Sequence, residues 1–274
     1  MTGPLTGPPN GPLTGPPTGP LTQDGFLGGR LRVWQPRDGY RAATDPVLLA
    51  AAVPALPGQR VLELGCGVGV ASLCLAARVP ELLSVAIERQ ADYADLARRN
   101  AIENCLALTV LTGDLAAPPP ALKGTEFDHV FANPPFFRAG DGTAARNAGR
   151  EGAFREETPL ALWIDAGLRR LRPGGWLTLI HLTDRLGDIL TALQGRAGSV
   201  AIRPVAAREG RGALRVIVKA RKTGRAPLRL LAPLILHDGP HHIADGDDFT
   251  AAAHAILRDG APIGWDETVP IRAP

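Results

Sequence analysis

The sequence predicts an α/β fold in which helices cover both faces of one doubly wound, mostly parallel sheet of seven strands. From Arg60 onward, short runs rich in leucine and β-branched residues alternate with longer helical patterns, as in sheets with crossover helices. A glycine-rich loop at residues 65–69 follows the first of these runs and precedes a helical pattern. The chain has 274 residues, 45% of them hydrophobic, which is enough for one such domain with a sizeable core.

The elements follow one another in the order that this fold requires. The strands are expected at residues 60–64, 83–88, 108–112, 127–132, 176–182, 200–204 and 213–220. The helices fit residues 70–78, 91–104, 158–171 and 184–193. Pro173-Gly174-Gly175 stops the third helix and forms a tight turn into the next strand.

The two ends of the chain differ from this pattern. Residues 1–24 are mostly a repeated Thr-Gly-Pro-Leu-Thr-Gly-Pro-Pro unit with almost nothing to bury, which predicts a disordered tail. The remaining 25–274 are expected to form one domain. It carries a pocket segment at 30–55 and a basic extension at 200–274, in which residues 228–257 dock on the sheet edge.

Composition limits the class of protein. Three cysteines without paired spacing favour a reduced, cytoplasmic protein over a disulfide scaffold. No apolar run has the length needed to cross a bilayer, so we expect no membrane partner. The net charge of +3 says something about partners only if the basic residues cluster.

The loop Glu63-Leu64-Gly65-Cys66-Gly67-Val68-Gly69 predicts a ligand site, because glycines let the backbone turn tightly and approach a ligand. A dinucleotide fingerprint would need a third glycine where Val70 stands, which argues against a nicotinamide dehydrogenase. Glu63 would repel phosphates and suit a cationic sulfonium or amino group. We therefore expect Glu63, Gly65, Gly67 and Gly69 to hold a cofactor without phosphate.

Two more acids follow neighbouring strands. Glu88 ends the second strand, where a carboxylate typically accepts hydrogen bonds from ribose hydroxyls, and Asp114 follows the third. Either acid alone could be a helix cap or a solvated loop residue. Three acids at three consecutive strand ends around a glycine loop instead indicate a binding site.

At this point the sequence resembles the class I methyltransferase superfamily, in which such acids hold S-adenosylmethionine, and the likeness covers most of residues 60–220. Gln35 to Arg41, Thr44-Asp45 and Asn133-Pro134-Pro135-Phe136-Phe137 resemble more closely the bacterial tRNA adenine-N6 methyltransferases that act beside the anticodon of a valine tRNA. The resemblance implies that the last hairpin supplies one antiparallel strand. It also implies that Tyr40, Arg41 and Asp45 fold over the cofactor pocket.

The chemistry of a base amine explains the tetrad Asn133 to Phe136. An amine conjugated to a purine is a poor nucleophile, and acceptors aimed at its N–H groups favour the charge that develops on it. The Asn133 side chain and the Pro134 carbonyl can be these acceptors, since consecutive prolines fix the turn. Phe136 can stack on the base, worth about 1–3 kcal/mol. The expected reaction is direct displacement at the sulfonium methyl by adenine N6 of a tRNA.

Several alternatives remain open. Relatives with the same tetrad methylate guanine N2 of ribosomal RNA or a glutamine of release factors; in the glutamine enzymes the fourth residue is usually Tyr, so Phe136 favours a base. An RNA-binding protein that keeps the fold without turnover would be expected to lose the tetrad or the glycine loop, and both are intact.

Basic residues do cluster near the C-terminus, with Glu209 as the only acid among them. On the strand at 213–220, Leu214, Val216 and Val218 are expected to point inward and Arg215 and Lys219 outward. Such an edge suits RNA phosphates, although a solvated edge strand would look the same. The cluster comprises Arg203, Arg208, Arg211, Arg215, Lys219, Arg221, Lys222, Arg225 and Arg229.

A histidine-rich turn invites a metal hypothesis. His237, Asp238, His241 and His242 are followed by three further aspartates, but their spacing does not support a defined metal site and Gly239-Pro240 marks a surface turn. We therefore expect no metal.

Overall fold

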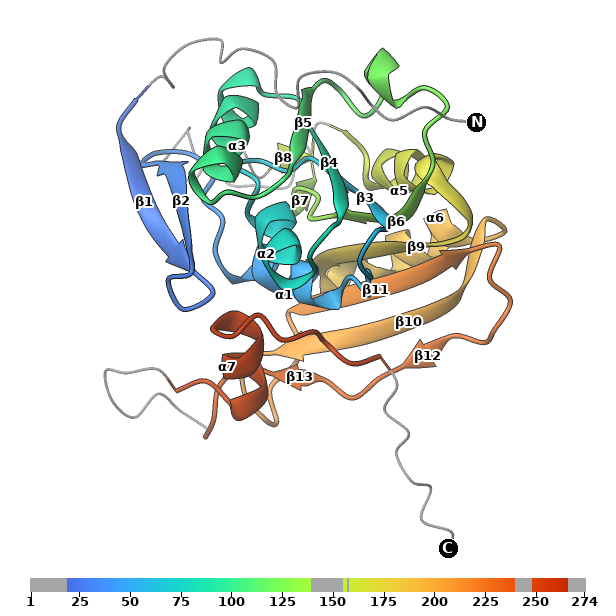
Figure 1. Cartoon of the computed structure of the whole chain (residues 1–274). Coiled ribbons are helices and arrows are strands. Elements are labelled where there is room, and N and C mark those ends of the chain that lie inside the picture. Colours follow the sequence, from blue (N-terminus) through green and yellow to red (C-terminus); the bar gives the residue numbers. More distant parts are fainter. Residues whose placement is uncertain (1–18, 139–154, 157, 240–247, 266–274) are drawn as a thin grey trace, which may run out of the picture.

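The computed structural model describes residues 19–138, 155–156, 158–239 and 248–265. Its centre is one sheet in which seven strands lie in the order β5-β4-β3-β6-β9-β11-β10 (Figure 1). Two short strands, β12 and β13, pair with the outer edge of β10 and bring the described sheet to nine. The bounds are β3 Arg60–Leu64, β4 Leu83–Glu88, β5 Thr109–Thr112, β6 Phe127–Ala132, β9 Leu171–Leu182, β10 Ala197–Ala206, β11 Arg215–Lys222, β12 Arg229–Leu230 and β13 Leu234–Ile235.

Strand directions confirm the mostly parallel sheet. The strands from β5 across to β9 are parallel neighbours. Among the seven, β11 runs antiparallel to both β9 and β10, which is the one reversed strand that the last hairpin was expected to supply. All seven predicted strands form within a few residues of their expected bounds. Pro173-Gly174-Gly175 lies inside β9. Leu171 of β9 pairs with Phe127 of β6 and Trp176 pairs with His129, so the pairing register shifts across this segment.

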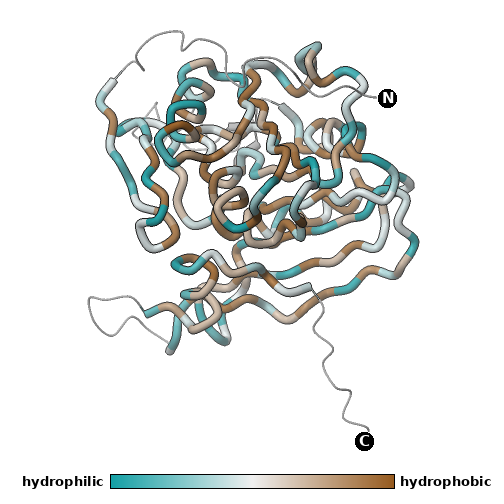
Figure 2. The backbone as a smooth tube through the Cα atoms, in the orientation of Figure 1, coloured by the Kyte–Doolittle hydropathy of each residue, from teal (hydrophilic) through white to brown (hydrophobic). Residues whose placement is uncertain are grey.

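Helices cover both faces, as predicted. Alternate strand residues face two separate cores: Val61 and Phe131 pack with α1, α2, α3 and α7, whereas Leu62 and Val130 pack with α5 and α6. The hydropathy colouring is accordingly brown along the central strands (Figure 2). The helices are α1 Thr44–Ala52, α2 Val70–Arg78, α3 Ala91–Glu103, α5 Leu160–Arg170, α6 Leu186–Leu193 and α7 Ala251–Leu257, with short 3-10 helices at Pro120–Leu122 and Thr183–Arg185.

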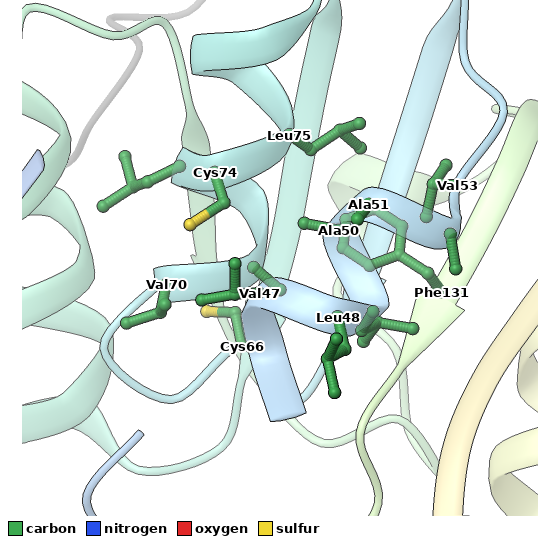
Figure 3. Close-up of a cluster of buried hydrophobic side chains, with 14 of the residues drawn as sticks. Val47, Leu48, Ala50, Ala51, Val53, Cys66, Val70, Cys74, Leu75 and Phe131 are labelled. Atoms are coloured by element: carbon green, nitrogen blue, oxygen red, sulfur yellow. The ribbon is translucent and has the colours of Figure 1, made fainter. Parts of the chain in front are cut away.

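Helix α1, inside the predicted pocket segment, is buried along nearly its whole length. Figure 3 shows Val47 and Ala50 of α1 among Cys74 and Leu75 of α2 and Phe131 of β6. An apolar helix without a polar face needs cover on all sides, and these neighbours provide it. The packing holds the segment before α1 against the glycine loop.

The N-terminal prediction is wrong in part. Residues 1–18 lie outside the described part of the chain, but Leu21–Phe26 forms β1 and pairs antiparallel with β2, Leu31–Pro36. The hairpin docks on α3, where the Asn100 side chain accepts from the Trp34 N–H at 2.8 Å and donates to the Trp34 carbonyl at 3.1 Å. The composition of the tail therefore placed its end too late in the sequence, because β1 is stabilised by pairing with β2 and the hairpin by docking on α3.

The predicted basic edge is also wrong, because β11 lies between β9 and β10 and both its faces are covered. Val216 and Val218 are buried as expected, but Leu214 precedes the strand and is 70% exposed. Lys219 is buried with its ammonium over the rings of Trp176 and Trp265, at 4.5 and 4.4 Å from their centroids. Charge reversal at Lys219 would consequently report on folding rather than on RNA contact.

The C-terminal part docks on the sheet edge through β12, β13 and α7, as expected of residues 228–257. After α7 the chain returns to α1: the Ile263 N–H donates to the Ala51 carbonyl at 2.8 Å, and the Trp265 indole donates to Ala52 at 2.9 Å. None of the described helices has the length and hydrophobicity needed to span a membrane.

Candidate active site

A cavity opens at the carboxyl ends of the parallel strands, where the strand order reverses between β3 and β6. Ligands of open α/β sheets bind at this topological switch point. The walls come from the segment before α1, the glycine loop, the ends of β4 and β5, the tetrad after β6 and α5. Predicted site residues on the walls are Tyr40, Glu63, Gly65, Gly67, Glu88, Asp114, Asn133, Pro134, Pro135 and Phe136.

The glycine loop is shaped by a close contact. Gly65 has a φ of 65°, and a Cβ atom there would lie 2.4 Å from Cη2 of Trp163 on α5. Gly69, with a φ of 90°, is the N-cap of α2 and is not among the residues that line the cavity. Only glycine fits this conformation at Gly65 without strain, and its missing side chain makes room for the Trp163 ring, so the loop and α5 pack closely at the cavity wall.

The Glu88 carboxylate organises the floor of the cavity. Oε2 accepts from the Gly67 N–H at 2.8 Å and Oε1 accepts from the Gln90 N–H at 2.9 Å. Burial raises the pKa of Glu88 above its usual value. The Arg89 N–H is a third backbone donor to this carboxylate, whose two oxygens together offer about four acceptor positions, so Glu88 can fix the loop and still accept from a ligand hydroxyl.

Glu63 is buried at the end of β3. Its Oε2 accepts from both the N–H and the hydroxyl of Ser72 on α2, at 2.9 and 2.5 Å. Removal from water raises the pKa of Glu63 to about 8, and the negative charge of Glu88 adds to the rise. In this state Glu63 is largely protonated at neutral pH, and a nearby cation would favour its ionised form.

Asp114 is the third acid on the cavity wall. Its Oδ1 accepts from the Ala116 N–H at 2.8 Å, so it also shapes the loop after β5. The end of β4 and the loop after β5 are linked, because the Gly113 N–H donates to the Glu88 carbonyl at 2.9 Å. Three acids thus converge, as the sequence predicted.

The tetrad begins at the end of β6 with a buried acceptor. The Asn133 Oδ1 is inaccessible to solvent and has no hydrogen-bond partner among the described residues. The amide nitrogen donates to the Tyr40 hydroxyl at 3.5 Å, a long bond. An unpaired buried acceptor costs about 1–3 kcal/mol, so a donor on the ligand would be strongly favoured here.

Phe136, at the end of the tetrad, contacts two residues from other strands. The Arg215 guanidinium lies over its ring, with Cζ 4.6 Å from the centroid, and the His181 ring meets it at 76° with centroids 5.4 Å apart. Phe137 begins the two-residue strand β7, Phe137–Arg138, which pairs with β8, Arg155–Glu156.

Three predicted cofactor residues do not line the cavity. Arg41 binds the N-terminal hairpin through Asp24, at 2.6 Å, and Thr22. Asp45 accepts from Arg215 Nε at 3.0 Å, and Gly69 is the N-cap of α2. The segment before α1 does reach the cavity, through Tyr40.

Among the residues near the cavity that sequence reasoning missed, three carry aromatic rings: Tyr93, Trp163 and His181. Tyr93 is in the first turn of α3, five residues after Glu88, and this proximity could have indicated it. Trp163 and His181 carry no local signal. Trp163 reaches the cavity only because α5 packs on the glycine loop, and its indole nitrogen is buried without a partner in the described chain.

The predicted RNA-binding residues separate into three groups. Arg203 and Lys219 are buried, and Arg203 donates to the Ala232 and Gly264 carbonyls at 2.9 and 2.7 Å. Arg208, Arg211 and Arg215 lie at the cavity end of β10 and β11; Arg208 pairs with Asp248, and Arg211 is exposed. Arg221 and Lys222 lie at the opposite end of β11, bonded to the Gly174 and Leu171 carbonyls.

The histidine-rich turn falls largely on residues 240–247, outside the described chain. In the part that the structure describes, His237 instead pairs with Asp248 and stacks on Phe249. No group of three or more potential metal ligands occurs among the described residues.

Comparison with known families agrees with this geometry. The sequence model of the methyltransferase small domain matches residues 43–184, more than half of the chain. The chain belongs to this family. In this methyltransferase the matched domain holds every lining residue of the cavity except Tyr40 and Ala42.

Relatives of this methyltransferase carry several functions. A tRNA1(Val) (adenine(37)-N6)-methyltransferase of Porphyromonas gingivalis is 34% identical over 175 residues, 61% of this chain and 68% of that one. A release factor glutamine methyltransferase of Xylella fastidiosa is 33% identical over 166 residues, 56% of this chain and 57% of that one. The crystal structure of a predicted O-methyltransferase from Agrobacterium tumefaciens superposes with a TM-score of 0.64 at 28% identity, covering 80% of this chain and 98% of that one. The expected class I methyltransferase fold is thereby confirmed.

Proposed function

We propose that this methyltransferase transfers the methyl group of S-adenosylmethionine to N6 of an adenine in tRNA. The observation that carries the proposal is the buried, unpartnered Oδ1 of Asn133 at the wall of an acid-lined cavity. An exocyclic amine supplies the N–H donor that this acceptor needs. The tRNA relative supports the choice of adenine.

The cavity fits the proposed cofactor. S-adenosylmethionine supplies an electrophilic methyl group on a sulfonium cation. Glu63 would hold the cationic part, Glu88 would accept from the ribose hydroxyls, and Asp114 would accept from the adenine amine. The match rests on the acceptor chemistry of these three carboxylates and on the positive φ of Gly65 and Gly67 in the loop between them, a conformation that glycine adopts readily.

The tetrad would position the acceptor amine. Asn133 Oδ1 and the Pro134 carbonyl accept from the two N–H groups of the target nitrogen, so that its lone pair is oriented and the developing positive charge is stabilised. Phe136 would contact the extruded base by stacking, and Arg208, Arg211 and Arg215 at the cavity end of the sheet would lie near the RNA backbone. Because the proposed acceptor is a tRNA, we infer that the activity is cytoplasmic.

Nucleoside analysis tests the proposal. The purified protein is incubated with labelled S-adenosylmethionine and, separately, with unmodified tRNA, with ribosomal RNA and with a release factor. We expect label in tRNA as N6-methyladenosine. Label in guanine N2 or in glutamine would assign the same site to one of the two other acceptors, and no transfer to any of them, with the cofactor bound, would support an RNA-binding protein without turnover.

A pH experiment tests the cofactor role of Glu63. Its pKa is raised to about 8 in the protein, so binding of a cation should lower that pKa and release a proton. Affinity for S-adenosylmethionine should therefore rise with pH up to about 8, by at most about tenfold per pH unit, and level off above it. Titration calorimetry in buffers of different ionisation enthalpy counts the proton.

The matched control is Glu63→Gln, which can still accept from Ser72. It should bind without this proton release, and the ligand's own titration is common to both proteins. Equal proton release by Glu63→Gln and the wild-type protein would remove Glu63 from the cofactor site.

A further inference from the structure

We propose that Arg215, oriented by Asp45, is a positioning residue that fixes the Phe136 ring against the acceptor base. The inference rests on the proposed function and adds a role that differs from phosphate binding. Arg215 opens β11, Asp45 lies in the first turn of α1, and Phe136 ends the tetrad, so three distant segments meet at one aromatic ring.

The geometry supports positioning. The Arg215 Cζ lies 4.6 Å from the Phe136 centroid, a distance at which a guanidinium is attracted to the face of the ring. Its Nε donates to Asp45 Oδ2 at 3.0 Å, which restricts the rotation of the guanidinium plane. Both charged side chains are largely shielded, with 29% and 19% exposure, so the pair is better ordered than an open surface ion pair.

Phe136 is held from another side by His181. This ring is fully buried, and its Nδ1 accepts from the Leu182 N–H at 2.8 Å, which sets its orientation at the end of β9. His181 meets Phe136 at 76°. A ring held between two oriented neighbours loses little freedom on binding a base, and this lowers the entropic cost of productive stacking.

Lysine could not replace Arg215 in this role. Its ammonium is a point charge without a plane to stack or an Nε to pair with Asp45 in the same geometry. A lysine would nevertheless keep the positive charge that a phosphate contact needs. Arg215→Lys therefore separates the two roles, and Asp45→Asn tests the orientation of the guanidinium.

The experiment is single-turnover methyl transfer at saturating cofactor and over a range of tRNA concentrations. Arg215→Ala and Arg215→Lys should both lower the rate at saturating tRNA by about three- to tenfold, the size of a partly shielded cation–π contact. Asp45→Asn should lower it in the same direction. In a Phe136→Ala background, Arg215→Ala should change the rate by less than about twofold, because the ring it positions is gone.

Arg99→Ala is the matched control. Arg99 lies over Trp34 at 4.3 Å, the same kind of contact on α3 and β2 away from the cavity, so its loss should leave the transfer rate unchanged. Melting temperature and S-adenosylmethionine affinity are measured on every variant. If Arg215→Ala does not fold, Arg215→Lys and Asp45→Asn carry the test.

Four outcomes would overturn the inference. A fully active Arg215→Lys with a smaller salt slope in Arg215→Ala would leave Arg215 as a phosphate contact only. A faster Arg215→Ala enzyme would mean that the guanidinium competes with the base for the ring. Equal effects of Arg215→Ala with and without Phe136 would show no coupling. A wild-type protein that methylates no base amine would overturn the proposed function, and the inference with it.

Discussion

Replacing Asn133 with alanine should lower the single-turnover rate of methyl transfer by about 10²–10³, the scale for removal of one preorganised polar group. Asn133 Oδ1 is buried without a partner among the described residues, so its hydrogen bond is available to the acceptor amine. That bond should strengthen as positive charge develops on nitrogen, and its loss should fall on the rate rather than on ground-state binding. Cofactor affinity, measured separately by calorimetry, should stay close to wild type.

Two further variants sharpen this test. Asn133→Asp keeps an acceptor of the same shape and should retain more activity than Asn133→Ala. Asn104→Ala removes an amide whose Oδ1 accepts from the Arg32 N–H at 3.0 Å outside the cavity, so it should affect stability alone. A wild-type transfer rate in Asn133→Ala would reduce the tetrad to a turn and remove the basis for methylation of a base amine through it.

Replacing Gly65 with alanine should destabilise the glycine loop by about 2–4 kcal/mol and greatly weaken cofactor binding. The new Cβ would lie 2.4 Å from Trp163 Cη2, and a φ of 65° is itself unfavourable for alanine. Either the loop or α5 must then move, and both form walls of the cavity. Denaturant unfolding measures the loss of stability, and calorimetry measures the loss of affinity.

Gly58→Ala provides the matched control, because Gly58 has a φ of 80° but nothing within 4 Å of its Cβ position. It isolates the backbone strain, about 1–2 kcal/mol, from the clash. Trp163→Phe removes the atoms that Gly65→Ala would hit and should partly restore stability in the double variant. Similar losses in Gly65→Ala and Gly58→Ala would show that Trp163 does not constrain the loop.

The parts of the site that lie at strand ends could be predicted from sequence. Glu63, Glu88, Asp114 and Asn133 each follow an apolar run, and parallel strands end at one edge of the sheet, so their convergence follows from topology alone. Trp163 and Arg215 could not be assigned in this way. Their places depend on how α5 and β11 pack, and no local pattern records that packing.

In β11, the alternation of apolar and basic residues led to a wrong prediction of which side chains face solvent. The prediction assumed that alternate residues of this strand face solvent. In the structure β11 lies inside the sheet, and both its faces are covered by the two cores. Lys219 is accommodated because two indole rings enclose its ammonium, and one of them, Trp265, lies 46 residues further along the chain. The charge pattern of the sequence does not show which side chains surround each basic residue.

The return of the chain to α1 makes this a fold of long-range contacts. The carbonyls of Ala51 and Ala52 find their partners only at Ile263 and Trp265, more than 200 residues later. The entropy lost in closing so large a loop is not offset until these contacts form. The docking of the last described residues on α1 is therefore expected to be slow relative to local helix formation. Until it is complete, the Ala51 and Ala52 carbonyls lack these partners and the Lys219 ammonium lacks the Trp265 ring. The last described residues thus complete both the end of α1 and the cover of a buried charge in the sheet.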